Sequence, residues 1–281
     1  MKNEGKTMIK MLINSILIFS SMTSCCQNEK ALIGKYMQIL PTVIAGNELH
    51  KYRMNAVYLN RDLYGNFTGK TKVTGEYTRG LKNDSVRWNN VFISASDNLN
   101  EDFGTGAKQE YMENFRYSPA KDMLKPDSFK DFPAGPETVL AKNLVWDMGA
   151  IESFAWEHIK DLKMNTDYTI PQSNEEFNMG GIGTYAHNNI HLCWTGICSF
   201  NDELCGVIEF RAVDNKIEMS VEPIKTKGTE QYWGTIRISL ETGLIEQAEM
   251  YGGTIQEIEI TGMENKMIAK TIRELWLDKI Q

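Results

Sequence analysis

The hydrophobic and polar residues in the first part of the chain alternate with a period of two, which predicts β-strands. Clusters of turn-forming residues separate the alternating runs, as expected for neighbouring antiparallel strands. The runs are rich in valine, tyrosine, threonine and tryptophan and cover residues 52–59, 69–78 and 85–94. This region therefore predicts an antiparallel meander, with a short further strand expected at about residues 111–117.

The last hundred residues return to the same alternation and predict a second meander. The expected strands cover residues 189–200, 204–213, 216–221, 231–240, 244–251, 254–260 and 267–277. Compact turn signals at Asn201-Asp202, Asp214-Asn215 and Glu241-Thr242-Gly243 predict tight hairpins between strands. The last run also satisfies a helical period, but we interpret it as a strand.

A spacing of three and four residues between apolar positions predicts two helices. The first is short, covers residues 29–43 and ends near Pro41. The second is a helical insert at about residues 133–162, with Pro136 in its first turn and a break expected at Gly149. Strands, one long helix and further strands predict an α+β fold, in which residues 31–281 form a single β-rich domain with the helix packed on one face of an antiparallel sheet.

The first residues of the chain have the pattern of an export signal. Lys2, Lys6 and Lys10 precede an apolar stretch at residues 11–19, which is too short to cross a bilayer because a span needs about 20 apolar residues. Small residues follow this stretch. We therefore expect residues 1–24 to be a cleaved signal peptide.

The segment MTSC, residues 22–25, resembles the lipobox of bacterial lipoproteins in the loose form found in Bacteroidetes. The resemblance implies a diacylglyceryl group on Cys25, cleavage before it and a lipidated tether at residues 25–30. Cys25 fits better than Cys26 because a small serine precedes it, whereas Met22 stands where leucine is usual. We therefore expect a lipid-anchored protein of the bacterial cell envelope, at the outer membrane. An ordinary signal with a coincidental cysteine pair and a buried amphipathic helix are the alternatives.

The composition and the net charge limit the classes of partner that can be expected. Hydrophobic residues make up 42% of the chain, enough for a sizeable core. The net charge is −7, and no basic cluster interleaved with aromatic residues is present, so nucleic acid is not an expected partner. No segment after the signal reaches the length of a membrane span, which leaves the lipid anchor as the expected contact with the membrane.

The run YWGTIRISLETGLIEQAEMYGG, residues 232–253, resembles the hairpins of the periplasmic lipoprotein-carrier superfamily, the Lol-type half-barrels. The order of helix, meander, helix and meander also matches that family in outline. The resemblance implies a strongly curved antiparallel sheet, a half-barrel, with a helical lid over an apolar cavity. It also implies an acyl chain or another apolar ligand. The alternative is that the central helix only buries one face of the sheet.

The functional hypotheses fall into three classes. A lipid-anchored carrier of an apolar or amphipathic ligand would hold it in a cavity lined by residues such as Val145, Met148, Trp156, Ile236 and Ile238. A structural or protein-interaction lipoprotein would instead have a tight core and an exposed apolar patch. An enzyme would need His187 and His191 in one cleft with an orienting carboxylate. We favour the carrier and expect neither enzymatic activity nor a cofactor.

The segment HNNIHLCWTGICSFNDELC, residues 187–205, holds the densest candidate chemistry. A two-residue turn at Asn201-Asp202 would place Cys198 opposite Cys205, a register that would allow a disulfide in an oxidising periplasm. Buried free thiols are the alternative for these two cysteines and for Cys193. The spacing does not fit a zinc site, so no metal is expected.

Other signatures are weaker. The chain has no HExxH, GxSxG or phosphate-binding loop motif. Asp147, Glu152 and Glu157 are five residues apart on the predicted helix and are interpreted as members of a solvated face. The segment Asp84-Ser85-Val86 resembles the acceptor of Bacteroidetes O-glycosylation, which makes Ser85 a candidate for modification.

Overall fold

The computed structural model describes residues 49–119, 126–135, 137–171 and 174–280 of the chain. The chain divides after Thr42, and every described residue belongs to the second unit, residues 43–281. The predicted signal peptide, the lipid attachment site Cys25, the tether and the short helix at 29–43 lie outside the described residues.

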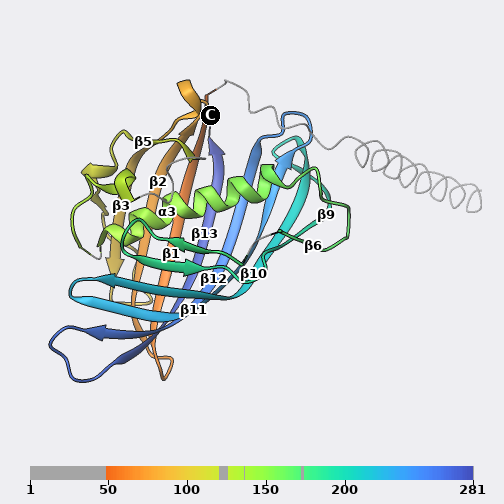
Figure 1. Cartoon of the computed structure of the whole chain (residues 1–281). Helices are drawn as coiled ribbons and strands as arrows, with labels where there is room; N and C mark the ends of the chain where they lie inside the picture. Colours follow the sequence, from red (N-terminus) through yellow and green to blue (C-terminus); the bar gives the residue numbers. More distant parts are fainter. Residues whose placement is uncertain (1–48, 120–125, 136, 172–173, 281) are drawn as a thin grey trace, which may run out of the picture. The chain divides into compact units, whose positions relative to one another are not determined.

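One large open sheet forms most of the described structure (Figure 1). Its strands follow the order β4-β3-β2-β1-β13-β12-β11-β10-β8-β7, with β5 beside β3, β9 beside β10 and β6 beside β9. All these strand pairs are antiparallel. The strands are β1 (His50–Asp62), β2 (Phe67–Arg79), β3 (Val86–Ser96), β4 (Ala107–Lys108), β5 (Phe115–Tyr117), β6 (Tyr168–Thr169), β7 (Glu176–Asn178), β8 (Gly183–Ala186), β9 (His191–Phe200), β10 (Glu203–Val221), β11 (Ile224–Ser239), β12 (Ile245–Ile260) and β13 (Met267–Ile280).

The two predicted meanders join into this single sheet because the first long strand pairs with the last. β1 and β13 run antiparallel in continuous register, from Lys51 opposite Ile280 to Asp62 opposite Ala269. The run at residues 267–277 is therefore a strand, as expected, and not a helix. The pairing of β1 with β13 joins the two meanders side by side in one open sheet. The strand order of this sheet begins at β4 and ends at β7.

The alternating sequence pattern corresponds to one buried and one solvated face. Along β1, Tyr52, Met54 and Ala56 are buried, whereas Lys51 and Arg53, which alternate with them, are exposed. Antiparallel sheets commonly have one face on the core and one in water, which is why their strands alternate so clearly. The hydrophobic period therefore identified the strands and also the face that carries the core.

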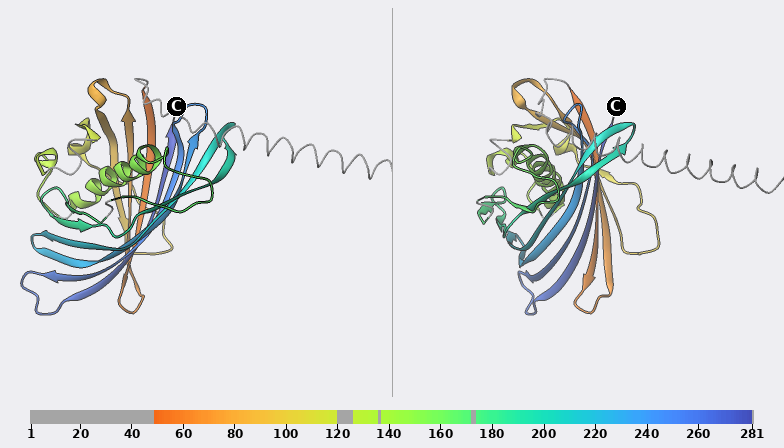
Figure 2. Two further views of the ribbon diagram at one scale, coloured as in Figure 1. Left: turned by 45° about the vertical axis from the view of Figure 1, so that its right-hand side comes forward. Right: turned by 90° about the vertical axis from the view of Figure 1, so that its right-hand side faces the viewer.

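The long helix of the described residues, α3 (Glu137–Glu152), lies across the buried face of the sheet, which curves around it (Figure 2). A π-helical turn, η4 (Ser153–Glu157), continues it. The predicted α+β fold with a curved sheet and a helix on one face is confirmed. Gly149 does not break α3, and residues 158–162 lie beyond the helix in a turn.

The helix approaches the sheet closely at β2. A Cβ atom on Gly75 would lie 3.1 Å from both Trp88 and Val91 and 3.2 Å from Leu144 of α3. Such contacts are tighter than ordinary packing, so a larger side chain at this position would push the helix away. The absence of a side chain at Gly75 therefore helps to set the distance between the two layers.

One predicted turn and one expected interruption are instead parts of long strands. Asp214-Asn215 was expected to make a hairpin, but β10 continues through it with a bulge between Ala212 and Asn215. Asp214 adopts a positive φ of 57° there. The break expected between residues 251 and 254 is likewise absent, since β12 runs through the glycine pair without interruption. The hairpin at Asn201-Asp202 is present as predicted, and both residues have positive φ.

Candidate functional site

A cavity of about 640 Å³ lies between α3 and the buried face of the sheet. This volume is within the range of small-molecule sites, roughly 300–1,000 Å³. Its apolar lining comes from the helix, from the sheet and from the segment that contains β7 and β8. The apolar and aromatic side chains are Tyr58, Val139, Leu140, Trp146, Ala150, Phe154, Ile170, Pro171, Phe177, Met179, Tyr185, Ile190, Ile217, Met219, Tyr232 and Met250.

Two adjacent stripes of α3 have different neighbours. Leu144, Met148 and Ile151 are fully buried at spacings of three and four residues, and this stripe packs on the sheet. The neighbouring stripe contains Asp147 and Ala150, which line the cavity. The helix therefore has one stripe that is fully buried and a neighbouring stripe that forms one side of the cavity.

The segment from residue 174 to 190 forms another wall. β7 and β8 pair with each other, and β8 pairs with the second half of β10 (Figure 1). The bulge in β10 supports this wall, because the buried side chain of Asn215 accepts a hydrogen bond of 3.0 Å from the backbone N–H of Asn188. The feature that the sequence suggested as a hairpin thus positions the end of this segment beside the cavity.

A buried ionic cluster forms the polar part of the cavity lining. The guanidinium of Arg273 on β13 lies 2.8 Å from Asp147 of α3 and 3.3 Å from Glu230 of β11. The side chains of Arg273 and Asp147 are 10% and 9% exposed, so both ions are removed from most of their hydration. Burial raises the pKa of Asp147 to about 6, with Arg273 lowering it and Glu230 raising it further.

This cluster is incompletely satisfied. The second carboxylate oxygen of Asp147, Oδ2, and the Nε of Arg273 have no hydrogen-bond partner among the described residues. Both residues line the cavity. Buried polar groups without a partner are costly, so such atoms in a native structure are candidates for contact with a ligand or with water.

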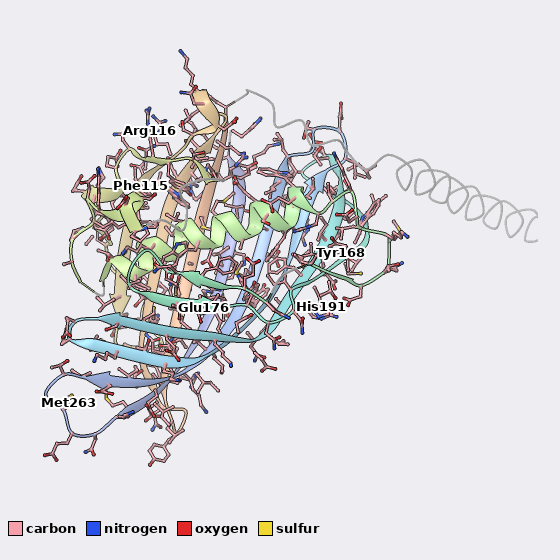
Figure 3. All side chains as sticks on the ribbon, viewed as in Figure 1. Phe115, Arg116, Tyr168, Glu176, His191 and Met263 are labelled. Carbon is pink, nitrogen blue, oxygen red and sulfur yellow. The ribbon has the colours of Figure 1, made fainter. Side chains whose placement is uncertain are left out.

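His187 and His191 do not share a cleft. His187 lines the cavity, and burial lowers the pKa of its imidazole to about 4, so this side chain is neutral at about pH 7. His191 is not among the residues lining the cavity. It lies where β9 meets β6 (Figure 3), and its Nδ1 is 2.7 Å from Asp167. The carboxylate of Asp167 therefore lies beside His191 and Arg211, and not in a cleft that His187 and His191 share.

The predicted register of Cys198 and Cys205 is correct, since the two residues are direct partners in the β9–β10 ladder. Both thiols are free in this structure, as is that of Cys193. Burial is the main cause that raises the pKa of Cys205 to about 12. A disulfide between them stays a prediction. In the part of the chain that the structure describes, no group of three or more His, Cys, Asp and Glu side chains could hold a metal ion.

The residues expected to line a cavity do not line this one. Val145, Met148, Ile236 and Ile238 are almost fully buried and are not among the residues that line the cavity. The indole N–H of Trp156 donates a hydrogen bond of 3.0 Å to the carbonyl of Gly243. The apolar pattern therefore correctly identified buried positions of the helix and the sheet but not the residues that line the open space.

The interpretation of the helix carboxylates as a solvated face is wrong for Asp147 and Glu152. Asp147 pairs with Arg273, and Glu152 accepts a hydrogen bond of 2.8 Å from the hydroxyl of Tyr77 and pairs with Arg79. Both carboxylates are buried. The available signal was their position on a broad apolar stripe, where an acidic residue requires a partner.

Ser85 follows the short helical turn η1 (Lys82–Asp84), so the turn expected at this sequence is present. Its hydroxyl donates a hydrogen bond of 2.8 Å to the carbonyl of Lys82. Modification of Ser85 stays a prediction. Separately, none of the helices within the described ranges is both long and apolar enough to span a bilayer.

Comparisons with known proteins assign no family. No protein-family model matches the chain, and no curated protein matches it in sequence. A solved structure of lipovitellin, described by its lipid-protein interactions, gives a TM-score of 0.38 at 12% identity over 83% of this chain. The match spans only 25% of the lipovitellin chain. A DUF1329 family protein from Desulfovibrio piger gives a TM-score of 0.14 at 7% identity, over 90% of this chain and 92% of its own. The resemblance to the lipoprotein-carrier superfamily thus stays an expectation from sequence.

Proposed function

We propose that the protein is a non-enzymatic, lipid-anchored binding protein of the bacterial cell envelope that holds an apolar or amphipathic ligand between its curved sheet and α3. The observation that supports this function is the cavity of about 640 Å³ with a largely apolar lining and a buried polar cluster. Transfer of an apolar chain from water into such a site is favourable, at roughly 25 cal/mol per Å² of apolar surface removed from water.

Native mass spectrometry of the full chain, purified gently from membranes, tests the binding function. We expect a bound molecule in addition to the anchor. Ala150 lines the cavity, so Ala150→Trp would occupy part of its volume and should remove the bound molecule. Ala107 lies exposed on β4 outside the cavity, and Ala107→Trp is the matched control that should retain it. A wild-type chain that carries only its anchor would contradict the proposal.

The anchor is a separate part of the proposal and rests on the lipobox-like segment that ends at Cys25. Cys25→Ala should release the protein from the membrane fraction and abolish labelling by radioactive palmitate. Cys26→Ala should do neither, which makes it the matched control. Retention of both membrane association and label in Cys25→Ala would contradict attachment at this residue.

A structural or protein-interaction role is the alternative, and the outer face of the sheet gives it some support. Trp233, Ile255 and Ile272 are 48%, 54% and 42% exposed on the neighbouring strands β11, β12 and β13. The register places all three on the same face, with Trp233 opposite Tyr251 and Ile272 opposite Gly253. Exposed apolar patches occur at sites of protein or membrane interaction. Replacement of all three by serine should leave ligand binding intact if the carrier function is correct, and should abolish cross-linking to envelope proteins if the alternative is correct.

A further inference from the structure

The charged residues that line the cavity are mostly acidic. Four carboxylates, those of Asp147, Glu157, Glu175 and Glu230, contribute to the lining, against a single permanently charged base, Arg273. Two histidines, His158 and His187, also line the cavity. His187 does not balance the carboxylates, because burial lowers its pKa to about 4 and keeps the imidazole neutral at about pH 7.

The one guanidinium is already occupied by two carboxylates. Arg273 contacts Asp147 at 2.8 Å and Glu230 at 3.3 Å, and its remaining exposure is small. Among the described residues that line the cavity, a carboxylate or phosphate group on a ligand would therefore find no guanidinium or ammonium free of a carboxylate, and it would approach the carboxylates of Asp147 and Glu230. Like charges in a site of low dielectric repel strongly, so an anionic head group is disfavoured.

The cluster has an unused acceptor, Oδ2 of Asp147, and an unused donor, Nε of Arg273, and the acceptor belongs to the side with the excess of charge. Asp147 is more than nine-tenths buried, lines the cavity, and its Oδ2 has no hydrogen-bond partner among the described residues. An ionised carboxylate only accepts hydrogen bonds. The group that would satisfy Oδ2 must therefore be a donor, and a charged donor would form the stronger bond.

We propose that the ligand of this cavity is an amphiphile with an aliphatic part and a hydrogen-bond-donating head, with an ammonium preferred over a hydroxyl and a carboxylate or phosphate rejected. The inference rests on the proposed binding function and specifies its ligand class. The aliphatic part lies against the apolar lining, and the head contacts Asp147. The carboxylates of Asp147 and Glu230, which are little exposed, compensate for the hydration that the ammonium loses on binding.

Three eight-carbon probes with different heads test this order: octylamine, octanol and octanoate. Each is titrated by calorimetry into the full chain in nanodiscs of zwitterionic lipid at about pH 8, where the amine is charged, with empty nanodiscs as the background. We expect octylamine to bind about tenfold more tightly than octanol, and octanoate to bind more weakly than both. Octanoate binding equal to or tighter than octylamine would overturn the inference. Binding of none of the three would instead contradict the proposed function.

Variants that replace a carboxylate by an amide test which residues cause the preference for an ammonium head. Asp147→Asn and Glu230→Gln each remove one negative charge and should lower octylamine affinity about tenfold while octanol affinity stays within about twofold. Glu249 pairs with Arg237 at 3.2 Å outside the cavity lining, so Glu249→Gln is the matched control and should change neither affinity. Unchanged octylamine binding in both cavity variants would overturn the role of these carboxylates. If Asp147→Asn does not fold, Glu230→Gln and the wild-type order of the three probes decide.

Discussion

Arg273 on β13 and Asp147 on α3 lie 2.8 Å apart, although 126 residues separate them in the sequence. This contact joins the helix to the last strand of the sheet at the edge of the cavity. Arg273 also reaches Glu230 on β11, so one side chain connects three elements. The same residues that fix the helix over the sheet therefore determine the charge that a ligand meets.

Octylamine binding should strengthen as pH rises through about 6. The pKa of Asp147 is about 6 because it is buried, and Arg273, Glu230, Tyr58 and Tyr232 face it. Burial raises the pKa of both tyrosines, which stay neutral, and arginine stays charged. An ammonium favours the ionised form of Asp147 and so lowers its pKa. Below about pH 6, binding of the ammonium must therefore release the proton of Asp147, and this weakens the binding.

Calorimetric titration at about pH 5 and about pH 7.5 measures this linkage, and we expect affinity to be about five- to tenfold weaker at the lower pH. Octanol should show a smaller change, because a neutral head shifts the pKa of Asp147 less. In Asp147→Asn the dependence should disappear. Equal octylamine affinities at the two pH values in the wild-type protein would argue against contact between the ammonium and this carboxylate.

Glu152→Ala should destabilise the fold strongly. The mutation removes the acceptor for the Tyr77 hydroxyl and the ion partner of Arg79, and breaking a buried pair costs about 3–5 kcal/mol. The free energy of unfolding can be measured by urea denaturation. Glu249→Ala, which breaks the partly exposed pair with Arg237, is the control and should cost less than about 1 kcal/mol. Equal losses of unfolding free energy in the two variants would indicate that the contacts of Glu152 with Tyr77 and Arg79 are solvated.

The sheet could be predicted from the sequence because each long strand has one buried and one solvated face. Period-two alternation is strongest in that situation. Turn positions were harder to assign, since Asp214 adopts a conformation typical of turns within a bulge of a continuous strand. Local residue types do not distinguish a bulge from a hairpin, because the difference depends on the strand that lies alongside.

The site was predicted only in part, for a related reason. The central helix and the covered apolar face follow from apolar spacing, but the burial of Asp147 depends on Arg273, which is contributed by the last strand. Nothing near Asp147 in the sequence indicates that partner. The distinction between Met148, which is fully buried, and Ala150, which lines the cavity, likewise cannot be read from the neighbouring residues in the sequence, because both positions fit the apolar spacing of the helix.

Gly234→Ala should be strongly destabilising although it adds one methyl group. The new Cβ would lie 2.0 Å from the carbonyl oxygen of Glu249 and 2.4 Å from a ring carbon of Phe210, so backbone must move. Overpacking of this kind costs about 1–3 kcal/mol or more. Gly253 is the matched control in the adjacent strand, since the only atom near its added Cβ is 4.0 Å away. Gly253→Ala should change stability by less than about 0.5 kcal/mol in the same urea titration. Similar effects of the two mutations would contradict the close approach of β11 and β12 at Gly234.

Cys205 should react slowly with iodoacetamide in the folded protein. Burial raises its pKa to about 12, so at about pH 8 the reactive thiolate is a very small fraction of the thiol. We expect alkylation at least a hundredfold slower than in concentrated urea, where the pKa returns to about 8.5. Peptide mass spectrometry identifies the modified cysteine. Fast labelling of Cys205 in the folded state would contradict its burial between β9 and β11.

The same assay, run with and without reductant in urea, tests the disulfide. Labelling of Cys198 and Cys205 that requires reductant would show that the pair is oxidised in the purified protein.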